Sequence, residues 1–175
     1  MNGIGNGADP PDPLLPDRQQ DERFMRQALH EAQVALEEGE TPVGAVAVHA
    51  GRIVARDHNR VERLTDATAH AEILVLGAAA SAIEDWRLTD VTFYVTMEPC
   101  PMCTGALLLS RVKRLVYGVR DARAGACGTR LDLVQANPFG HDLRLVDGIL
   151  ENDCRALLQE FYRTLRAKGD GDTAG

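Results

Sequence analysis

The order of apolar segments along the chain constrains its fold more than any other feature. Residues 43–59 form two short runs rich in β-branched residues around Ala50-Gly51, which predicts a β-hairpin. Beyond this hairpin, continuous apolar runs typical of strands covered on both faces alternate with segments of helical periodicity. This order predicts an α/β protein, in which a mixed five-stranded sheet is the middle layer of a three-layer α/β/α domain. The five expected strands are 43–49, 52–59, 90–97, 113–119 and 142–148.

Helices are expected to cover this sheet, and both ends of the chain are expected to lie outside the folded domain. Four of the eight prolines fall in the first 16 residues beside Gly, Asn and Asp, a composition that cannot bury enough apolar surface to fold. We therefore expect a disordered Pro-rich tail over residues 1–20, a folded domain over 21–167 and a second disordered tail over 168–175. Thr68 is the candidate N-cap of the second helix. The expected helices are 21–37, 68–83, 101–111, a short piece at 131–136, and 152–166.

Size and hydropathy favour a single soluble domain. A chain of 175 residues with 45% hydrophobic composition is long enough to close one sizeable core. Apolar runs stay well short of the roughly 20 residues that a membrane span needs. The first residues also lack the basic stretch followed by an apolar one that an export signal needs. We therefore expect a cytoplasmic protein with no membrane partner.

Charge is distributed unevenly along the chain. The net charge of −7 by itself argues against a nucleic-acid partner. Residues 1–40 hold nine acidic side chains and three arginines, a balance of −6, whereas residues 99–135 hold six basic side chains and two acidic ones, a balance of +4. The second segment is a candidate nucleic-acid surface, although arginines scattered over a solvated face explain the charge equally well.

Two short motifs carry the chemistry: His70-Ala71-Glu72 and, some 30 residues later, a C-x-x-C formed by Cys100 and Cys103. Each lies in the first turn of an expected helix, where side chains reach a common point beyond the helix end and the helix dipole stabilises thiolates. One histidine and two cysteines leave the fourth tetrahedral position of a zinc ion open for water, as a catalytic site requires. Glu72 is then the carboxylate that takes and returns protons. We expect one Zn²⁺ per subunit.

A structural zinc site or a redox pair is the alternative reading of the same cysteines. An isolated C-x-x-C is compatible with either, and a structural site needs a fourth protein ligand. None of the remaining histidines and cysteines forms a spaced pair typical of a zinc finger, and Cys127 and Cys154 are more simply explained as small buried apolar residues. The other candidate ligands are His30, His49, His58 and His141.

HAE followed by PCPMC resembles the H-x-E and P-C-x-x-C signature of the zinc cytidine/adenosine deaminase superfamily. Residues 22–166 further resemble the bacterial tRNA-specific adenosine deaminases in order and without large gaps. The resemblance implies a cytidine-deaminase-like fold, a homodimer, and hydrolytic deamination of adenosine to inosine at the wobble position of a tRNA anticodon stem-loop. It is carried by the segments TPVGAVAVHAGRIVARDHNR, TAHAEI, RLTDVTFYVTMEPCPMCTGALLLSRVKRLVYGVRDARAGACG and GILENDCRALLQEFYRTLR.

The resemblance also implies residues that bind the substrate. Asn59 and Asp121 are expected to contact the flipped nucleotide and its neighbour, and Thr41 and Ala71 to line the base pocket. The last helix is expected to meet the anticodon loop, since extruded bases stack on aromatic faces and phosphates pair with arginine. An amphipathic helix that merely closes the sheet is the alternative for that helix, and a local salt bridge in an exposed turn is the alternative for Arg120 and Asp121. The expected contacts of the last helix are Phe161, Tyr162, Arg163 and Arg166.

Three functions remain open at this point. In the first, Glu72 takes a proton from water that attacks C6 of adenine, then protonates the ring nitrogen and the departing amine. A deaminase of free guanine, cytosine or nucleosides shares the metal site, but it does not need the loop GVRDARAGACG or an arginine-bearing last helix. A non-catalytic zinc-containing RNA-binding protein predicts a closed metal site and no dependence on Glu72.

Overall fold

A mixed five-stranded sheet forms the centre of the computed structural model, which describes residues 18–171. The strand order is β2-β1-β3-β4-β5, with β1 antiparallel to β2 and β3, and with β3, β4 and β5 parallel. The opening hairpin therefore forms one edge of the sheet, and the parallel strands form the other. The strands are β1 (Gly44–His49), β2 (Arg52–His58), β3 (Val91–Met97), β4 (Arg114–Val119) and β5 (Arg144–Val146).

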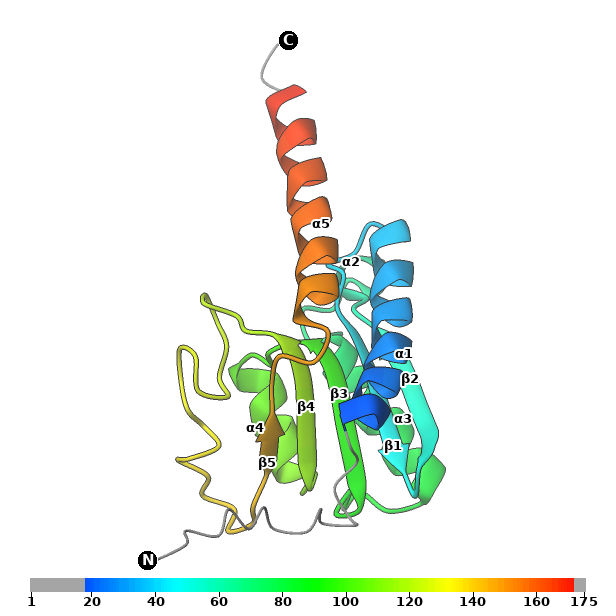
Figure 1. The fold of residues 1–175 in the computed structure, drawn as a ribbon, viewed down its shortest axis with the longest axis vertical. Helices are drawn as coiled ribbons and strands as arrows, with labels where there is room; N and C mark the ends of the chain where they lie inside the picture. The colour runs from blue at the N-terminus through cyan, green and yellow to red at the C-terminus, as the bar shows by residue number, and fades with distance from the viewer. Residues whose placement is uncertain (1–17, 172–175) are drawn as a thin grey trace, which may run out of the picture.

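Helices cover both faces of this sheet, as Figure 1 shows. Helices α3 and α4 pack on one face and helices α1 and α5 on the other, where α5 continues past the edge of the sheet. The expected three-layer α/β/α architecture with a mixed five-stranded sheet is confirmed. The helices are α1 (Arg18–Glu37), α2 (Val61–Leu64), α3 (Ala71–Ile83), α4 (Pro101–Leu109) and α5 (Glu151–Gly171).

The central strands supply two cores because successive side chains of a strand point to opposite faces. Phe93 of β3 packs with the α3 and α4 side and pairs with Ala47 of β1, whose small side chain leaves room for the ring. Tyr94, the next residue, packs with the α1 and α5 side. Both rings are fully buried, which stabilises the fold by about 1.5–3 kcal/mol for a side chain of this size.

A buried ion pair fixes the first turn of α1 against the sheet. The two terminal guanidinium nitrogens of Arg114 donate to the carboxylate of Asp21 over 2.7 Å, and the Tyr94 hydroxyl donates to the same carboxylate over 3.0 Å. Because Asp21 comes from α1, Tyr94 from β3 and Arg114 from β4, the three side chains connect one helix with two strands.

The helices differ from expectation at several places. Helix α1 begins at Arg18, α5 runs on to Gly171, α4 ends at Leu109, and α3 takes His70 rather than Thr68 as its N-cap. The short helix α2 was not expected. Within the described chain, 131–136 forms turns instead of a helix, because Pro138 follows too closely for the turn to be extended. The two expected tails fall mostly on residues 1–17 and 172–175, outside the described residues. A helix long and apolar enough to cross a bilayer does not occur between residues 18 and 171.

Candidate active site

The starts of α3 and α4 meet beside the ends of the central strands, and the two chemical motifs lie there. His70 is the N-cap of α3, and Cys100, which follows β3, is the N-cap of α4 with Pro101 in the first helical turn. Proline is favoured at this position because its missing N–H has no helical partner. The approach to α3 is shaped by Asp66, whose carboxylate accepts the amide of Thr68 at 2.8 Å and its hydroxyl at 2.7 Å. The sequence therefore suggested the right segment but the wrong role for Thr68.

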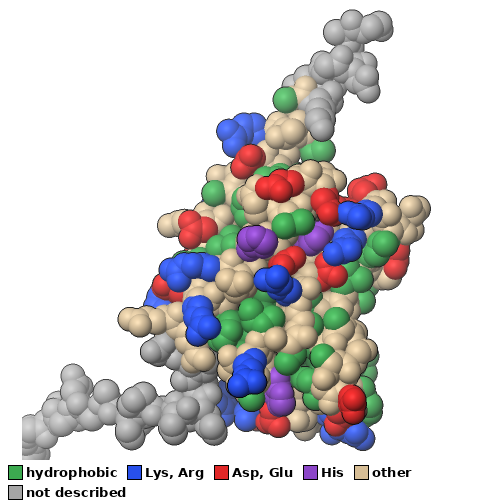
Figure 2. Space-filling model, turned by 90° about the vertical axis from the view of Figure 1, so that its right-hand side faces the viewer, with side chains coloured by type: hydrophobic (Ala, Val, Ile, Leu, Met, Phe, Trp, Pro, Cys, Tyr) green, Lys and Arg blue, Asp and Glu red, His purple; other side chains and the backbone are tan. Residues whose placement is uncertain are grey.

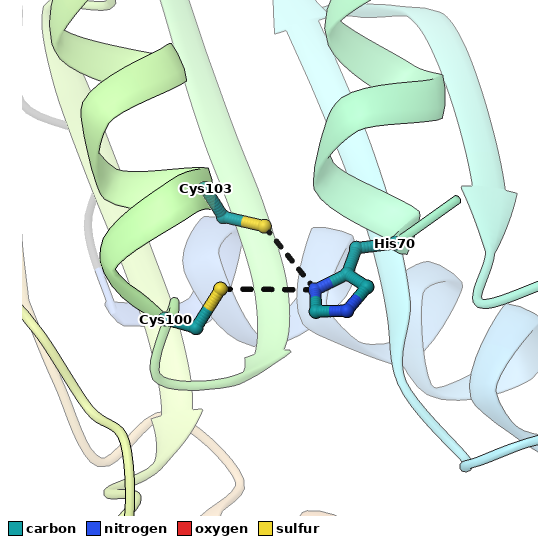
Figure 3. A group of neighbouring side chains, drawn as sticks. All are labelled: His70, Cys100 and Cys103. Atoms are coloured by element: carbon teal, nitrogen blue, oxygen red, sulfur yellow. Dashed lines mark hydrogen bonds between the residues drawn. The ribbon is translucent and has the colours of Figure 1, made fainter. Parts of the chain in front are cut away.

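His70, Cys100 and Cys103 point toward one another, as Figure 3 shows. The Nδ1 atom of His70 lies 3.8 Å from Sγ of Cys100 and 3.4 Å from Sγ of Cys103, and all three ligand atoms lie within 4.8 Å of one another. A tetrahedral zinc ion, bound about 2.0 Å from nitrogen and about 2.3 Å from sulfur, sets nitrogen and sulfur roughly 3.6 Å apart. The donor atoms therefore fit such an ion. They are the single group of three or more possible ligands among residues 18–167, whose side chains the structure describes.

The electrostatics of these side chains suit a metal cation. A hydrogen bond from Cys103 and a further one from His70 lower the pKa of the Cys100 thiol to about 4. The same hydrogen bond to Cys100, together with burial, raises the pKa of Cys103, so the pair without a metal shares one proton. The hydrogen bond to Cys100 raises the pKa of His70. A cation that replaces these protons satisfies all three donors.

Glu72 lies in the first turn of α3, beside the three metal-binding candidates. Its side chain is 4% exposed, and this burial raises the pKa of its carboxyl above the usual value. A hydrogen bond with Cys103 and the charge of His70 act on the same carboxyl, so Glu72 is adjacent to the ligand group without being part of it. A buried carboxyl of raised pKa is suited to accept and return protons.

A cavity of about 660 Å³ opens onto the metal-binding candidates, a volume in the range of sites for small ligands. One wall comes from the segment around Thr41 and Asn59, another from the loop that follows β4, and a third from α5. Eight of the predicted site residues line it. They are Thr41, Asn59, His70, Glu72, Cys100, Asp121, Phe161 and Tyr162.

The remaining predicted residues lie elsewhere. Cys103 is fully buried behind the cavity, where it completes the metal-binding group. Ala71 is also fully buried and does not line the cavity. Arg163 and Arg166 are exposed on α5, outside the cavity lining, so their expected contacts with an anticodon loop stay predictions.

Helix α5 has a mixed character that the sequence reading did not resolve. Cys154 and Leu158 pack into the core against the sheet, with Tyr162 at its margin. Phe161 meets Tyr162 edge to face at 5.5 Å between ring centroids, and both rings line the cavity. Leu165, in contrast, is 48% exposed and lines the cavity. Closure of the sheet and formation of the cavity wall therefore use successive turns along one face of the same helix.

The basic segment 99–135 is less open than its charge suggests. Arg114 is 6% exposed and paired with Asp21, and Arg120 forms a salt bridge with Asp147. Arg120 therefore does form a salt bridge, but with an acid 27 residues away rather than locally within its turn, and Asp121 lines the cavity. The face that Figure 2 presents is the β2 side of the molecule, away from this segment, and there too acidic and basic side chains are intermixed rather than gathered into a field of one sign.

Two buried acids were missed by the sequence reading, although both line the cavity. Glu40 is 1% exposed and accepts the side-chain amide of Asn59 at 3.0 Å and the main-chain amide of Arg63 at 2.8 Å. Glu98 is 3% exposed and accepts main-chain amides of the loop after β4. Their positions in the sequence could have indicated them, because each lies next to a predicted site residue. Glu98 is two residues before the first cysteine of the C-x-x-C, and Glu40 directly precedes Thr41.

Comparison with known proteins agrees with this geometry. A tRNA-specific adenosine deaminase of Bacillus subtilis is 48% identical over 149 residues, which cover 85% of this chain and 92% of the relative. A solved structure from a study of A-to-I editing by tRNA:A34 deaminases at the wobble position of transfer RNA superposes with a TM-score of 0.75 at 40% identity, covering 78% of this chain and 99% of its own. A guanine deaminase from Bacillus subtilis superposes with a TM-score of 0.57 at 33% identity, covering 66% of this chain and 74% of its own.

The match to a protein family extends over nearly the same residues as the resemblance found in the sequence. The family model of MafB19-like deaminases matches residues 19–166, which include every predicted site residue. The chain therefore belongs to the deaminases, in the MafB19-like family by its sequence model and among the tRNA-specific adenosine deaminases by its relatives.

Proposed function

We propose that this protein is a zinc-dependent enzyme that hydrolyses the wobble adenosine of a tRNA anticodon to inosine. The observation that carries the proposal is the convergence of His70, Cys100 and Cys103 at the base of a cavity, with the non-ligand acid Glu72 beside them. The relatives named as tRNA-specific adenosine deaminases support the choice of substrate.

The three ligands suit a catalytic rather than a structural zinc ion. His70, Cys100 and Cys103 would hold the ion, and the described chain offers no fourth histidine, cysteine or carboxylate atom in the same group. When bound, zinc lowers the pKa of a coordinated water from about 15.7 to about 7 and so supplies the nucleophile at neutral pH. Two thiolates would balance the charge of the cation, which keeps the cavity floor near neutrality.

Glu72 carries the protons of the reaction. Hydrolysis adds the oxygen of water to C6 of adenine and releases the exocyclic amine as ammonia, so both protons of the water must move. Glu72 takes one from the water and delivers it to the ring nitrogen, then takes the second and delivers it to the departing amine. Its burial supports this role, because a raised pKa makes the carboxylate a stronger base toward water and brings its pKa closer to neutral pH, where a group that both takes and returns protons works best.

The cavity walls suit a base that has left its stack. Phe161 and Tyr162 present aromatic rings to the cavity, and stacking on such rings accepts any base. Asn59 and Asp121, on opposite loops, offer polar groups to the flipped nucleotide and its neighbour. Arg163 and Arg166 follow on the exposed side of α5, where they would meet phosphates of the anticodon loop.

Deamination of free guanine is the second candidate, because a guanine deaminase shares the fold. The aromatic wall from α5 and the polar loop with Asp121 favour a nucleotide within RNA. The test is to incubate the zinc-loaded protein with an anticodon stem-loop that carries adenosine at the wobble position, and separately with guanine, cytosine and adenosine. We expect inosine in the stem-loop and no ammonia from the free compounds; the reverse pattern would refute the RNA substrate.

Assembly and location complete the proposal. We expect two chains to form the homodimer that the sequence resemblance implies, and we expect it to work in the cytoplasm on mature or precursor tRNA. Light scattering measures the first expectation directly.

A further inference from the structure

Glu98 is a buried acid outside the metal-binding group, and both oxygens of its carboxylate accept hydrogen bonds from the loop after β4. Its Oε2 atom accepts the main-chain N–H of Asp121 at 3.0 Å. Its Oε1 atom accepts the main-chain N–H of Cys127 at 3.0 Å and of Thr129 at 3.2 Å. At 3% exposure, these amides replace the water that an ionised carboxylate otherwise requires.

The loop closes around this carboxylate without spare room. A Cβ atom on Gly125 would lie 2.4 Å from the Cδ and Oε2 atoms of Glu98, so only glycine fits there. The amide of Ala126 donates to the Pro99 carbonyl at 2.9 Å, and the amide of Glu98 donates to Val119 at 2.8 Å. The loop is therefore fastened to the turn that leads into the first cysteine ligand.

This loop supplies one wall of the cavity. Asp121, Arg123 and Ala124 all line it. The Asp121 carboxylate is oriented in turn, because it accepts the amide of Arg123 at 2.8 Å. The direction in which Asp121 faces the cavity thus depends on main-chain atoms that Glu98 holds.

We propose that Glu98 is a positioning residue that fixes the Asp121 wall relative to the metal ligands and thereby sets how tightly the RNA around the target nucleotide is bound. The proposal rests on the function proposed above. Glu98 itself neither holds the metal nor transfers a proton, since both its oxygens are occupied by amides. Loss of its charge should loosen the wall, while Cys100 and Glu72 stay in place on α4 and α3.

The test compares Glu98→Gln with Glu84→Gln, a control at the exposed C-cap position that follows α3. Glutamine keeps the shape of the Glu98 side chain, but its NH₂ group would face at least one main-chain N–H of the loop, so two donors would meet and a hydrogen bond would be lost. For Glu98→Gln we expect KM for the stem-loop to rise about tenfold. This is the rise expected if only about a tenth of the variant molecules keep the loop in the conformation that binds RNA. We also expect kcat within about twofold, one zinc per chain, and faster amide exchange over residues 121–129. Glu84→Gln should match the wild type in all four measurements.

Gly125→Ala gives a second, independent perturbation if Glu98→Gln fails to fold. It leaves Glu98 intact and displaces the loop from the other side, so the same rise in KM and the same faster exchange are expected. Unchanged exchange over 121–129, an unchanged KM, or a loss of zinc that accounts for the lost activity overturns the positioning role. A wild-type protein that forms no inosine refutes the proposed function instead, and the exchange comparison then decides whether Glu98 holds the loop.

Discussion

Replacing Asp21 by asparagine should strongly destabilise the fold, although Asp21 is far from the active site in the sequence. The carboxylate is 3% exposed and receives two hydrogen bonds of 2.7 Å from Arg114 and one of 3.0 Å from Tyr94. In Asp21→Asn an amide NH₂ faces the guanidinium, and the positive charge of Arg114 stays buried without a counter-charge. Its Nε atom already has no hydrogen-bond partner. Breaking one partner of such a pair costs about 3–5 kcal/mol.

The assay is urea denaturation followed by far-UV circular dichroism, with the free energy of unfolding taken from the midpoint and slope. Glu22→Gln is the matched control on the same helix, where Glu22 pairs with the exposed Arg18 and Arg26. Such pairs contribute about 0.3–0.5 kcal/mol each. The triple variant Asp21→Leu, Arg114→Met, Tyr94→Phe should recover much of the loss, since it leaves no buried charge or hydroxyl. A loss for Asp21→Asn no larger than that for Glu22→Gln would refute the reasoning.

Three further predictions concern the site and the packing around it. Glu72→Gln should retain one zinc per chain by metal analysis yet lose about 10²–10⁴-fold in kcat on the stem-loop, and a rate near wild type would exclude its proton transfer. After zinc removal at pH 8, iodoacetamide should label Cys100, whose pKa is lowered to about 4 and whose side chain is half-buried. Mass spectrometry should find Cys127 and Cys154 unlabelled until the protein is unfolded, because burial raises the pKa of each to about 12. Added zinc should protect Cys100, and equal labelling of all three cysteines would contradict these environments. Gly44→Ala should lower the free energy of unfolding by about 1–3 kcal/mol. The new Cβ would lie 2.1 Å from the Ala28 carbonyl oxygen and would push α1 away from β1. An unchanged midpoint of urea denaturation would show that α1 can shift without any loss of stability.

Periodicity and short motifs determined much of this protein before any coordinates. The alternation of strand and helix segments sufficed for the five-stranded α/β/α architecture, because buried strands and amphipathic helices have different hydrophobic periods. The spacing within His70-Ala71-Glu72 and within the C-x-x-C predicted a group of side chains that could hold a metal, and the structure brings His70, Cys100 and Cys103 together because the first turns of the two helices meet. Local rules failed at Thr68, where the Asp66 side chain accepts the backbone amide, and at 131–136, where Pro138 prevents extension of the turn into a helix.

Tertiary structure alone decided which polar side chains are shared between distant segments. Asp21 and Arg114 are separated by 93 residues, and Glu98 reaches amides 23 to 31 residues away, so no local pattern marks either as buried. The local excess of arginines likewise overstated the open positive surface, since Arg114 and Arg120 are neutralised by acids from other segments. A sequence records the charge of each side chain, but its electrostatic effect depends on burial and on partners that only the folded chain brings within hydrogen-bonding distance.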